Sequence, residues 1–155
     1  YHPGGSIGKT LLLVKDIMLK GNKIPFISFN KNIEQAVKII SKKNLGIGII
    51  VKSRKVIGIV TDGDIRRGSK KYTEKTKITN LMTKSPLFIS EDISAAKALS
   101  IMSDKKITSL IVSSESDFKK KKKIFSAKGI LHIHSLLKYG MEKSGQSVLH
   151  QVPTL

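Results

Sequence analysis

The sequence predicts an α/β (α+β) fold built from two β-α-β-β-α repeats related by pseudo-twofold symmetry. Residues 15–68 and 78–140 follow the same order of hydrophobic runs, helical periods and turns, which indicates an internal duplication. One alignment brings together four pairs of residues: Ala36 with Ala98, Leu45 with Ile107, Ile50 with Val112, and Gly58 with Gly129. A unit of roughly 55–65 residues buries too little surface to be stable alone, so we expect the halves to share an interior.

The first copy is expected to contain three strands and two helices. Pro25 forces its neighbour out of helical geometry, and Asn32 precedes a segment with apolar residues at i, i+3, i+4 and i+7. Two short apolar segments then indicate a buried strand and its hairpin partner. The expected elements are a strand at 24–29, a helix at 33–43, strands at 45–51 and 56–60, and a helix at 62–67 that Gly68 ends.

The second copy repeats this order with a longer hairpin loop. We expect a strand at 87–89, a helix at 93–105 capped by Asp92, strands at 108–112 and 127–131, and a helix at 135–139. Residues 69–79 form a polar connector, and residues 141–155 lack strong periodicity, as in a frayed tail or a final helix turn. The lysine run 119–123 is expected at the loop tip as a solvated segment, with a polyanion patch as the alternative.

Composition excludes several classes of function. There is no cysteine, so disulfides, thiolate zinc sites and cysteine nucleophiles are ruled out. No apolar stretch approaches the roughly 20 residues that span a bilayer, and no signal peptide is visible, so we expect a soluble, cytoplasmic protein without a membrane partner. The net charge of +18 suggests nucleic acid as a partner, but only three of the 29 basic residues are arginine, which disfavours base readout.

The segment Gly58-Ile59-Val60-Thr61-Asp62-Gly63-Asp64 is the sharpest local motif. It joins the end of a strand to the start of a helix, where backbone N–H groups can hold a phosphate. The candidate ligand-binding side chains are one hydroxyl and two carboxylates, which suit sugar oxygens, and two cations, which suit a phosphate: Thr61, Asp62, Asp64, Arg66 and Arg67. The alternative uses the same atoms, because Thr61 and Asp64 can form a capping box that needs no ligand. The spacing alone does not decide between them.

The corresponding segment of the second copy, residues 129–135, has neither the threonine nor the aspartate. His132 can replace Thr61 as a donor, and His132 with His134 are candidates to line the partner cleft. Two histidines without a neighbouring carboxylate make a poor metal site, so we expect no metal and no cofactor. His2, in His-Pro-Gly-Gly, has a side chain suited to proton transfer, but no acidic or basic partner lies near it in sequence.

These features together resemble a tandem CBS pair, also called a Bateman module. The resemblance covers about residues 15–140 and rests on Ile17-Met18 and Leu81-Met82 at the start of each copy and on the Gly58–Asp64 motif. That motif matches the family's nucleotide-binding pattern of Gly, two residues, Thr or Ser, two residues, and Asp. The resemblance implies a nucleotide-containing regulatory ligand between the halves and self-association through the pair.

A more specific resemblance is to the C-terminal half of the arabinose-5-phosphate isomerase family. It rests on the ordered segments HPGGSIGKTLL, VKDIM, IP, KKNLGIGIIV and GIVTDGDIRR. In that family a sugar-isomerase (SIS) domain precedes the CBS pair, so the resemblance implies four parts: the end of an SIS domain at 1–13, CBS repeats at 14–72 and 73–140, and a tail at 141–155. His2 matches the histidine assigned to the active site, although the remaining catalytic groups are missing here and the chain alone is not expected to be catalytic.

The resulting hypothesis is a regulatory CBS pair of an enzyme that interconverts ribulose 5-phosphate and arabinose 5-phosphate for Kdo and lipopolysaccharide synthesis. A nucleotide-sugar such as CMP-Kdo is a natural feedback ligand. Three alternatives stay open: a purely structural module that assembles the enzyme as a dimer or tetramer, a cationic nucleic-acid-binding domain, and a CBS pair that serves a different enzyme. An assembly module should associate without any ligand. A nucleic-acid-binding domain should bind RNA or DNA with a steep dependence on salt concentration.

Overall fold

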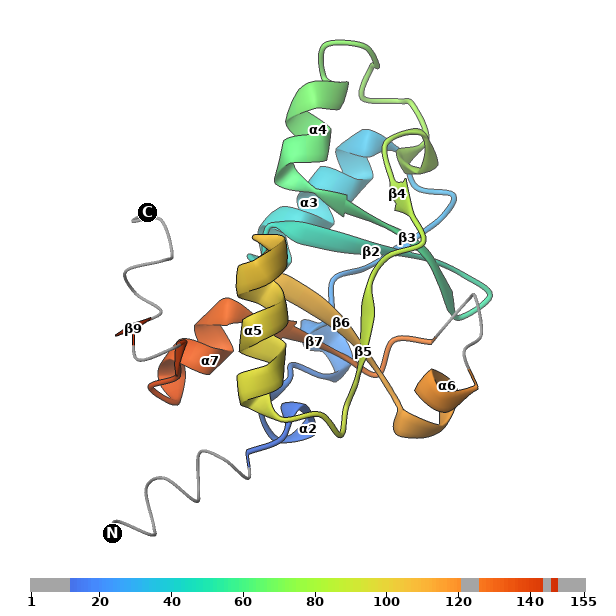
Figure 1. The fold of residues 1–155 in the computed structure, drawn as a ribbon. Helices are drawn as coiled ribbons and strands as arrows, with labels where there is room; N and C mark the ends of the chain where they lie inside the picture. Colours follow the sequence, from blue (N-terminus) through green and yellow to red (C-terminus); the bar gives the residue numbers. More distant parts are fainter. Residues whose placement is uncertain (1–11, 121–125, 144–145, 148–155) are drawn as a thin grey trace, which may run out of the picture.

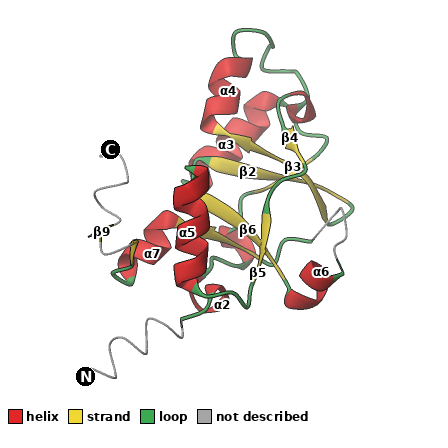
Figure 2. Cartoon of the chain, in the orientation of Figure 1, coloured by secondary structure: helices red, strands yellow, loops and turns green. Residues whose placement is uncertain are grey.

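Two small sheets organise the chain, and each packs against its own helices (Figures 1 and 2). The computed structural model describes residues 12–120, 126–143 and 146–147. The first sheet has the order β1-β2-β3-β4 and the second has the order β5-β6-β7. Their strands are β1 (Phe26–Ser28), β2 (Ile47–Lys52), β3 (Lys55–Thr61), β4 (Thr83–Lys84), β5 (Phe88–Ser90), β6 (Ser109–Ser113) and β7 (Gly129–His132). The α/β class and the two-copy architecture are confirmed.

The helices of the first copy begin and end close to their expected positions. Helix α3 (Ile33–Lys43) is capped by Asn32, whose side chain accepts a hydrogen bond from the backbone N–H of Gln35 at 2.9 Å. Asn44 ends the helix in the left-handed region with φ of 59°. Helix α4 (Asp62–Gly68) starts directly after β3 and carries two acidic residues in its first turn, where they complement the helix dipole.

The second copy departs from the prediction at its first helix and in its hairpin loop. Helix α5 (Ala95–Lys105) is capped by Ser94, not Asp92, because the Ser94 Oγ accepts from the backbone N–H of Lys97 while Asp92 pairs with Lys15 at 2.9 Å. The expected hairpin loop contains a short helix, α6 (Glu115–Lys119), with Ser114 as its cap, and α6 includes the first lysine of the run 119–123. Residues 121–123 of that run lie outside the described part of the chain.

The C-terminal helix and the segment after it also differ from expectation. Helix α7 (Ile133–Lys138) begins two residues earlier than predicted, because His132 caps it through its own ring nitrogen. The prediction of a frayed tail or a helix turn from residue 141 is wrong for the described residues. Met141 is buried in the core, and β8 (Glu142–Lys143) pairs antiparallel with β9 (Gln146–Ser147).

The register of the two sheets confirms the alignment of the copies. In the first sheet Ile50 pairs with Ile27 on one side and with Gly58 on the other. In the second sheet Val112 pairs in the same way, with Ile89 and Gly129 as its neighbours. The aligned helix residues Ala36 and Ala98 are both fully buried. The duplication therefore holds at the level of individual backbone pairs.

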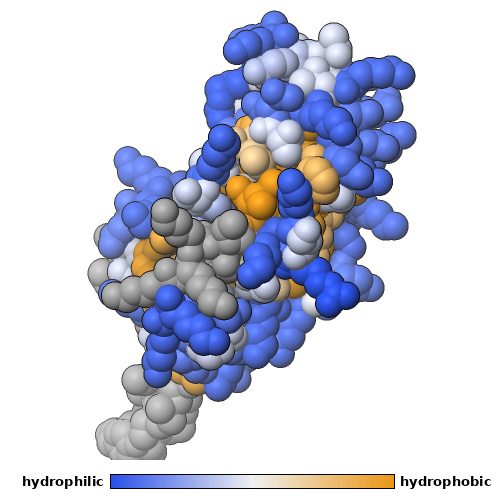
Figure 3. All heavy atoms as spheres, turned by 90° about the vertical axis from the view of Figure 1, so that its right-hand side faces the viewer, coloured by the Kyte–Doolittle hydropathy of each residue, from blue (hydrophilic) through white to orange (hydrophobic). Residues whose placement is uncertain are grey.

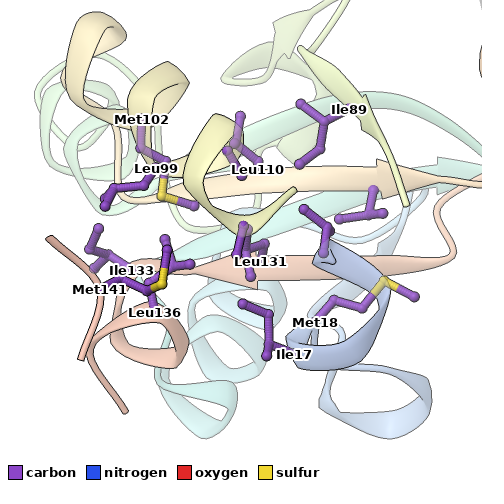
Figure 4. Packing of buried hydrophobic residues seen from close by; sticks show 14 residues of the cluster. Ile17, Met18, Ile89, Leu99, Met102, Leu110, Leu131, Ile133, Leu136 and Met141 are labelled. Carbon is purple, nitrogen blue, oxygen red and sulfur yellow. The ribbon is translucent and has the colours of Figure 1, made fainter. Parts of the chain in front are cut away.

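The short segments at the start of each copy are exchanged between the halves. Helix α2 (Val14–Ile17), at the start of the first copy, packs into the core of the second, and Figure 4 shows Ile17 near Leu131. Next to it, Leu19 forms an antiparallel bridge with Ile130 of β7. In the reciprocal position, the turn η2 (Ile78–Asn80) packs into the core of the first copy, and β4 pairs with β3.

Two equivalent glycines allow this exchange. A Cβ on Gly129 would lie 2.5 Å from the Met18 Sδ and 2.9 Å from the Leu19 carbonyl oxygen. A Cβ on Gly58 would lie 2.7 Å from the Met82 Sδ and 2.9 Å from the Thr83 carbonyl oxygen. Both distances are below ordinary contact, so the exchanged segment reaches the strand only because neither position has a side chain.

A third cluster of buried residues joins the halves, as the marginal size of each copy requires. It takes side chains from both sheets: Ile24, Ile47, Ile49, Val56, Phe88, Ile111 and Ile130. On the face seen in Figure 3, hydrophobic atoms are exposed near the middle, and hydrophilic side chains surround them. The two copies therefore share one interior, built from side chains of both.

Candidate functional site

A cavity of about 330 Å³ lies between the two copies and is bounded by both. The first copy contributes the turn before β2, the middle and end of β3, and the start of α4. The second contributes the segment before β5, the turn before β6, and part of β6. The lining combines aliphatic side chains from both copies with polar ones, namely Thr61 and Asp62 from the first copy and Lys106, Thr108 and Ser109 from the second. This volume is within the range of small-molecule sites.

Thr61 lines this cavity and also caps helix α4. Its Oγ1 accepts a hydrogen bond from the backbone N–H of Asp64 at 3.2 Å, and the Asp64 Oδ2 accepts from the Thr61 N–H at 2.9 Å. The capping box foreseen as the alternative is therefore formed. It does not use the Thr61 hydroxyl proton, so that hydroxyl keeps a donor for a molecule in the cavity.

The two arginines fold back toward the start of α4. The Arg67 Nη2 lies 2.6 Å from the Asp64 Oδ1. A Cβ built on Gly63, which lines the cavity, would lie 3.2 Å from the Arg67 Nη1 and 3.7 Å from the Arg66 Nη2. The two guanidinium groups thus lie near the first turn of α4, which borders the cavity, an arrangement that suits an anion.

The carboxylates of the motif occupy different positions. Asp62 is exposed and lines the cavity, and its backbone N–H donates to the carbonyl of Gly46 at 3.1 Å. Asp64 is not among the lining residues, and its side chain is 17% exposed. Of the five candidates in this motif, the structure places Thr61 and Asp62 on the cavity wall, and the other three are not among the lining residues.

The equivalent junction of the second copy has different chemistry. The backbone pairs Ile47 with Thr61 and Ser109 with His132, so His132 takes the place of Thr61. The His132 Nδ1 accepts from the backbone N–H of His134 at 3.1 Å, and the ring centroids are 4.4 Å apart. Burial, followed by the charge of His134, lowers the pKa of His132 to about 4. The ring is therefore neutral at physiological pH.

Neither histidine lines the cavity described above, and their assignment to a partner cleft stays a prediction. In the described part of the chain, no group of three or more metal-ligating side chains comes together. Over the same residues, no helix combines the length and the apolar character needed to cross a bilayer. His2 and its His-Pro-Gly-Gly segment lie outside the described residues.

Sequence reasoning missed the cavity wall that the second copy supplies. That wall comprises Pro86, Leu87, Lys106, Ile107, Thr108, Ser109 and Ile111. The alignment held a usable signal, because it places Ile107 on Leu45, and both of these residues line the cavity. A motif search finds residues that resemble a pattern, whereas this wall differs from the first copy at most positions.

A model of the CBS domain matches the chain twice, at residues 14–71 and 78–142. Among curated proteins, an uncharacterised protein, RP505, of Rickettsia prowazekii is 36% identical over 91% of this chain and 42% of its own length. The arabinose 5-phosphate isomerase KdsD of Francisella tularensis is 40% identical over 72% of this chain and 35% of its own length. The KdsD of Salmonella typhi is 35% identical over 90% of this chain and 41% of its own length. The chain thus spans about two fifths of the length of these relatives.

Solved structures agree with this fold. The CBS domain pair of protein MJ0100, in complex with 5'-methylthioadenosine and S-adenosyl-L-methionine, is 25% identical and has a TM-score of 0.67. The match covers 83% of this chain and 94% of that one. A putative acetoin utilization protein of Vibrio cholerae has a TM-score of 0.70 at 15% identity, over 83% and 89% of the two chains.

Proposed function

The chain belongs to the CBS domain family, and from that premise we propose that it is the ligand-sensing CBS pair of a sugar-phosphate isomerase of the arabinose-5-phosphate isomerase type. The observation that carries the proposal is the cavity between the copies, with Thr61 on its wall and two guanidinium groups at its edge. The proposed ligand is a nucleotide or a nucleotide-sugar such as CMP-Kdo. Adenosine derivatives in the MJ0100 pair support a nucleoside ligand.

The proposed binding mode assigns one part of the ligand to each group of the motif. The aliphatic walls cover the base, because apolar surfaces favour a flat ring that leaves water. Asp64 accepts from the ribose hydroxyls, and Thr61 donates its free hydroxyl proton to a sugar or phosphate oxygen. Arg66 and Arg67 hold the phosphate next to Gly63. In this binding mode the Arg67 guanidinium contacts both the Asp64 carboxylate and the phosphate.

The exchange of leading segments supplies a physical route from this ligand to a preceding domain. Helix α2 follows directly on residues 1–13 and packs into the core of the second copy, which forms one wall of the cavity. A ligand that moves the two copies relative to each other also moves α2. Regulation requires that the ligand bind two states of the enzyme with different affinity. Feedback inhibition in the cytoplasm by a pathway end product is the proposed form of this coupling.

Calorimetric titration of the chain with CMP-Kdo, AMP and ATP tests the proposal. We expect at least one of them to bind, and Thr61→Ala to weaken that binding about tenfold through loss of a hydrogen bond to a charged group. Ser94→Ala is the matched control, because Ser94 also caps a helix but does not line the cavity. The absence of heat with all three ligands, or an equal effect of both variants, would reject the sensing role.

An assembly module is the second candidate, and the exposed apolar side chains favour it. Phe26, Phe29, Leu87, Phe118 and Tyr139 are between 37% and 48% exposed. Exposed aromatic groups of this kind are enriched at protein interfaces. Sedimentation of the enzyme with and without residues 15–140 tests this role. Association that depends on these residues and is unaffected by nucleotides would establish assembly without sensing.

A further inference from the structure

Two equivalent helix-to-strand turns bound the cavity from opposite copies. In the first copy the turn follows α3 and contributes Leu45, Gly46 and Ile47 to the lining. In the second copy it follows α5 and contributes Lys106, Ile107, Thr108 and Ser109. The strand registers and the helix ends give the same equivalence, with Asn44 opposite Lys106 and Ile47 opposite Ser109. One turn is therefore apolar toward the cavity, while the other carries a cation and two hydroxyls.

Lys106 occupies a backbone position that lysine does not favour. It ends α5 in the left-handed region with φ of 56°, where the first copy has Asn44 at φ of 59°. Asparagine and glycine adopt this conformation readily, whereas a long side chain does so at a cost. The residue at this position nevertheless lines the cavity, on the copy opposite to the one that carries the two arginines of α4.

Ser109 shows a second departure from the first copy. Its Oγ is buried and has no hydrogen-bond partner in the described part of the chain, while the equivalent residue of the first copy is the apolar Ile47. A buried hydroxyl without a partner costs free energy. Rotation about one bond changes the direction of the hydroxyl, and Ser109 already lines the cavity. A ligand that carries an acceptor at this wall would satisfy the hydroxyl.

We propose that the ligand carries a second anionic group, separate from the phosphate at α4, and that Lys106 and Ser109 of the second copy bind this group. The inference rests on the proposed function and narrows its ligand class to nucleotides that carry two separate anionic groups: nucleoside diphosphates and triphosphates or nucleotide-sugars with an acidic sugar. Lys106 supplies the charge and Ser109 donates a hydrogen bond. A nucleoside monophosphate has no second group for these two residues to bind.

The charge is tested by comparing ligands that differ in their second anionic group. Calorimetry on the full chain with AMP against ADP, and with CMP against CMP-Kdo, gives an affinity ratio for each pair. We expect ADP to bind about tenfold more tightly than AMP, or CMP-Kdo about tenfold more tightly than CMP. Lys106→Asn should abolish that affinity ratio without weakening the binding of the monophosphate. Asparagine is the residue of the first copy at this position, so the fold is retained.

Lys105→Asn is the matched control for net charge. Lys105 is the last residue of α5, is exposed and does not line the cavity, so its removal lowers the charge equally and should leave the ratio intact. If Lys105→Asn and Lys106→Asn reduced the affinity ratio equally, the ratio would come from the overall charge of +18, and the inference would be overturned. An unchanged ratio in Lys106→Asn, with the ligands still bound, would also overturn it and leave the proposed function standing.

The hydroxyl is tested with two serines that are alike in the free protein. Ser113 also has a buried Oγ without a partner among the described residues, but it does not line the cavity. We expect both Ser109→Ala and Ser113→Ala to fold. Only Ser109→Ala should weaken the binding of the ligand with a second anionic group, by about fivefold. Equal affinities of the two variants would overturn the role of Ser109. Failure of the unmodified chain to bind any of the four ligands would reject both the proposed function and this inference.

Discussion

The β3–α4 and β7–α7 junctions occupy equivalent positions in the two copies, yet they cap their helices in different ways. At the first, Thr61 and Asp64 exchange hydrogen bonds and leave a hydroxyl proton free at the cavity. At the second, a buried imidazole caps the helix through its own ring nitrogen. Both solutions satisfy the orphan N–H groups of a helix start. The fold therefore requires a cap at each junction, but only the first cap lies on the wall of the described cavity.

The exchange of leading segments, in contrast, is the same in both copies. Each uses a methionine that packs over a glycine in the middle of a strand, Met82 over Gly58 and Met18 over Gly129. Both glycines lack room for a Cβ, and both approach a carbonyl oxygen of the exchanged segment. The duplicated features that hold the halves together have stayed alike, whereas the features near the cavity have diverged.

The largest expected effect breaks this exchange. Gly129→Ala should destabilise the chain by about 2–3 kcal/mol, because the new Cβ overlaps the Leu19 carbonyl oxygen, which belongs to the backbone and cannot rotate away. Gly58→Ala should cost a similar amount against the Thr83 carbonyl oxygen. Urea unfolding of both variants measures the two values. A difference of more than about 1 kcal/mol would show that the halves do not depend equally on the exchange.

The next effect concerns pH and distinguishes the two junctions. Because the pKa of His132 is lowered from its ordinary value to about 4, the unfolded chain binds more protons than the folded chain between these values. The stability due to the neutral ring is thus complete above pH 6.5 and is lost as the pH falls toward 4. His132→Asn keeps a capping side chain and removes the titration.

We expect the free energy of unfolding of His132→Asn to fall by about 1–2 kcal/mol less than that of the unmodified chain when the pH changes from 7 to 4.5. Thermal unfolding at a series of pH values measures the difference, and subtraction removes the contribution of the carboxylates that titrate in the same range. The ring centroid of His134 lies 4.4 Å from that of His132, and the charge of His134 contributes to the lowered pKa of His132. Parallel pH profiles of the two proteins would contradict the burial of a neutral ring.

How much of this the sequence predicts depends on the range of the interactions. Helix α3 and the strand registers were predictable, because a strong apolar period and a glycine alignment carry local information. The exchange was not, since α2 has four residues and its position is determined by contacts with Glu91 and Ile93, far along the chain. Thr61 and Asp64 were found by their spacing, whereas Lys106 and Ser109 could be found only through their place in the fold.

A smaller effect compares the third residue of each junction helix. Asp64→Ala removes the acceptor for the Thr61 N–H and the partner of Arg67, and should cost about 1 kcal/mol. Ser135→Ala, the equivalent change, should alter stability by less than about 0.5 kcal/mol. Thermal unfolding of both variants, each at neutral pH and without nucleotide, gives the comparison. Equal losses would mean that α4 gains nothing from its capping box.

The smallest effect concerns the ion pair that joins the exchanged helix α2 to the second copy. Lys15 and Asp92 lie 2.9 Å apart, and the pair raises the pKa of Lys15 through the hydrogen bond and charge of Asp92. Both side chains are at least 40% exposed, so water and salt screen their attraction. Lys15→Met should therefore change the melting temperature by about 1 °C or less.

Backbone hydrogen bonds and the burial of Val14 hold α2 in place. The backbone N–H groups of Val14 and Lys15 donate to carbonyls of the second copy at 2.9 and 3.0 Å, and Val14 is fully buried. Val14→Ala should consequently cost more than Lys15→Met, at about 1–2 kcal/mol from lost methyl groups and an unfilled space. Differential scanning calorimetry of the two variants decides between charge and burial. A larger loss from Lys15→Met would mean that the exchange depends on surface charge, and that salt alone would then release α2.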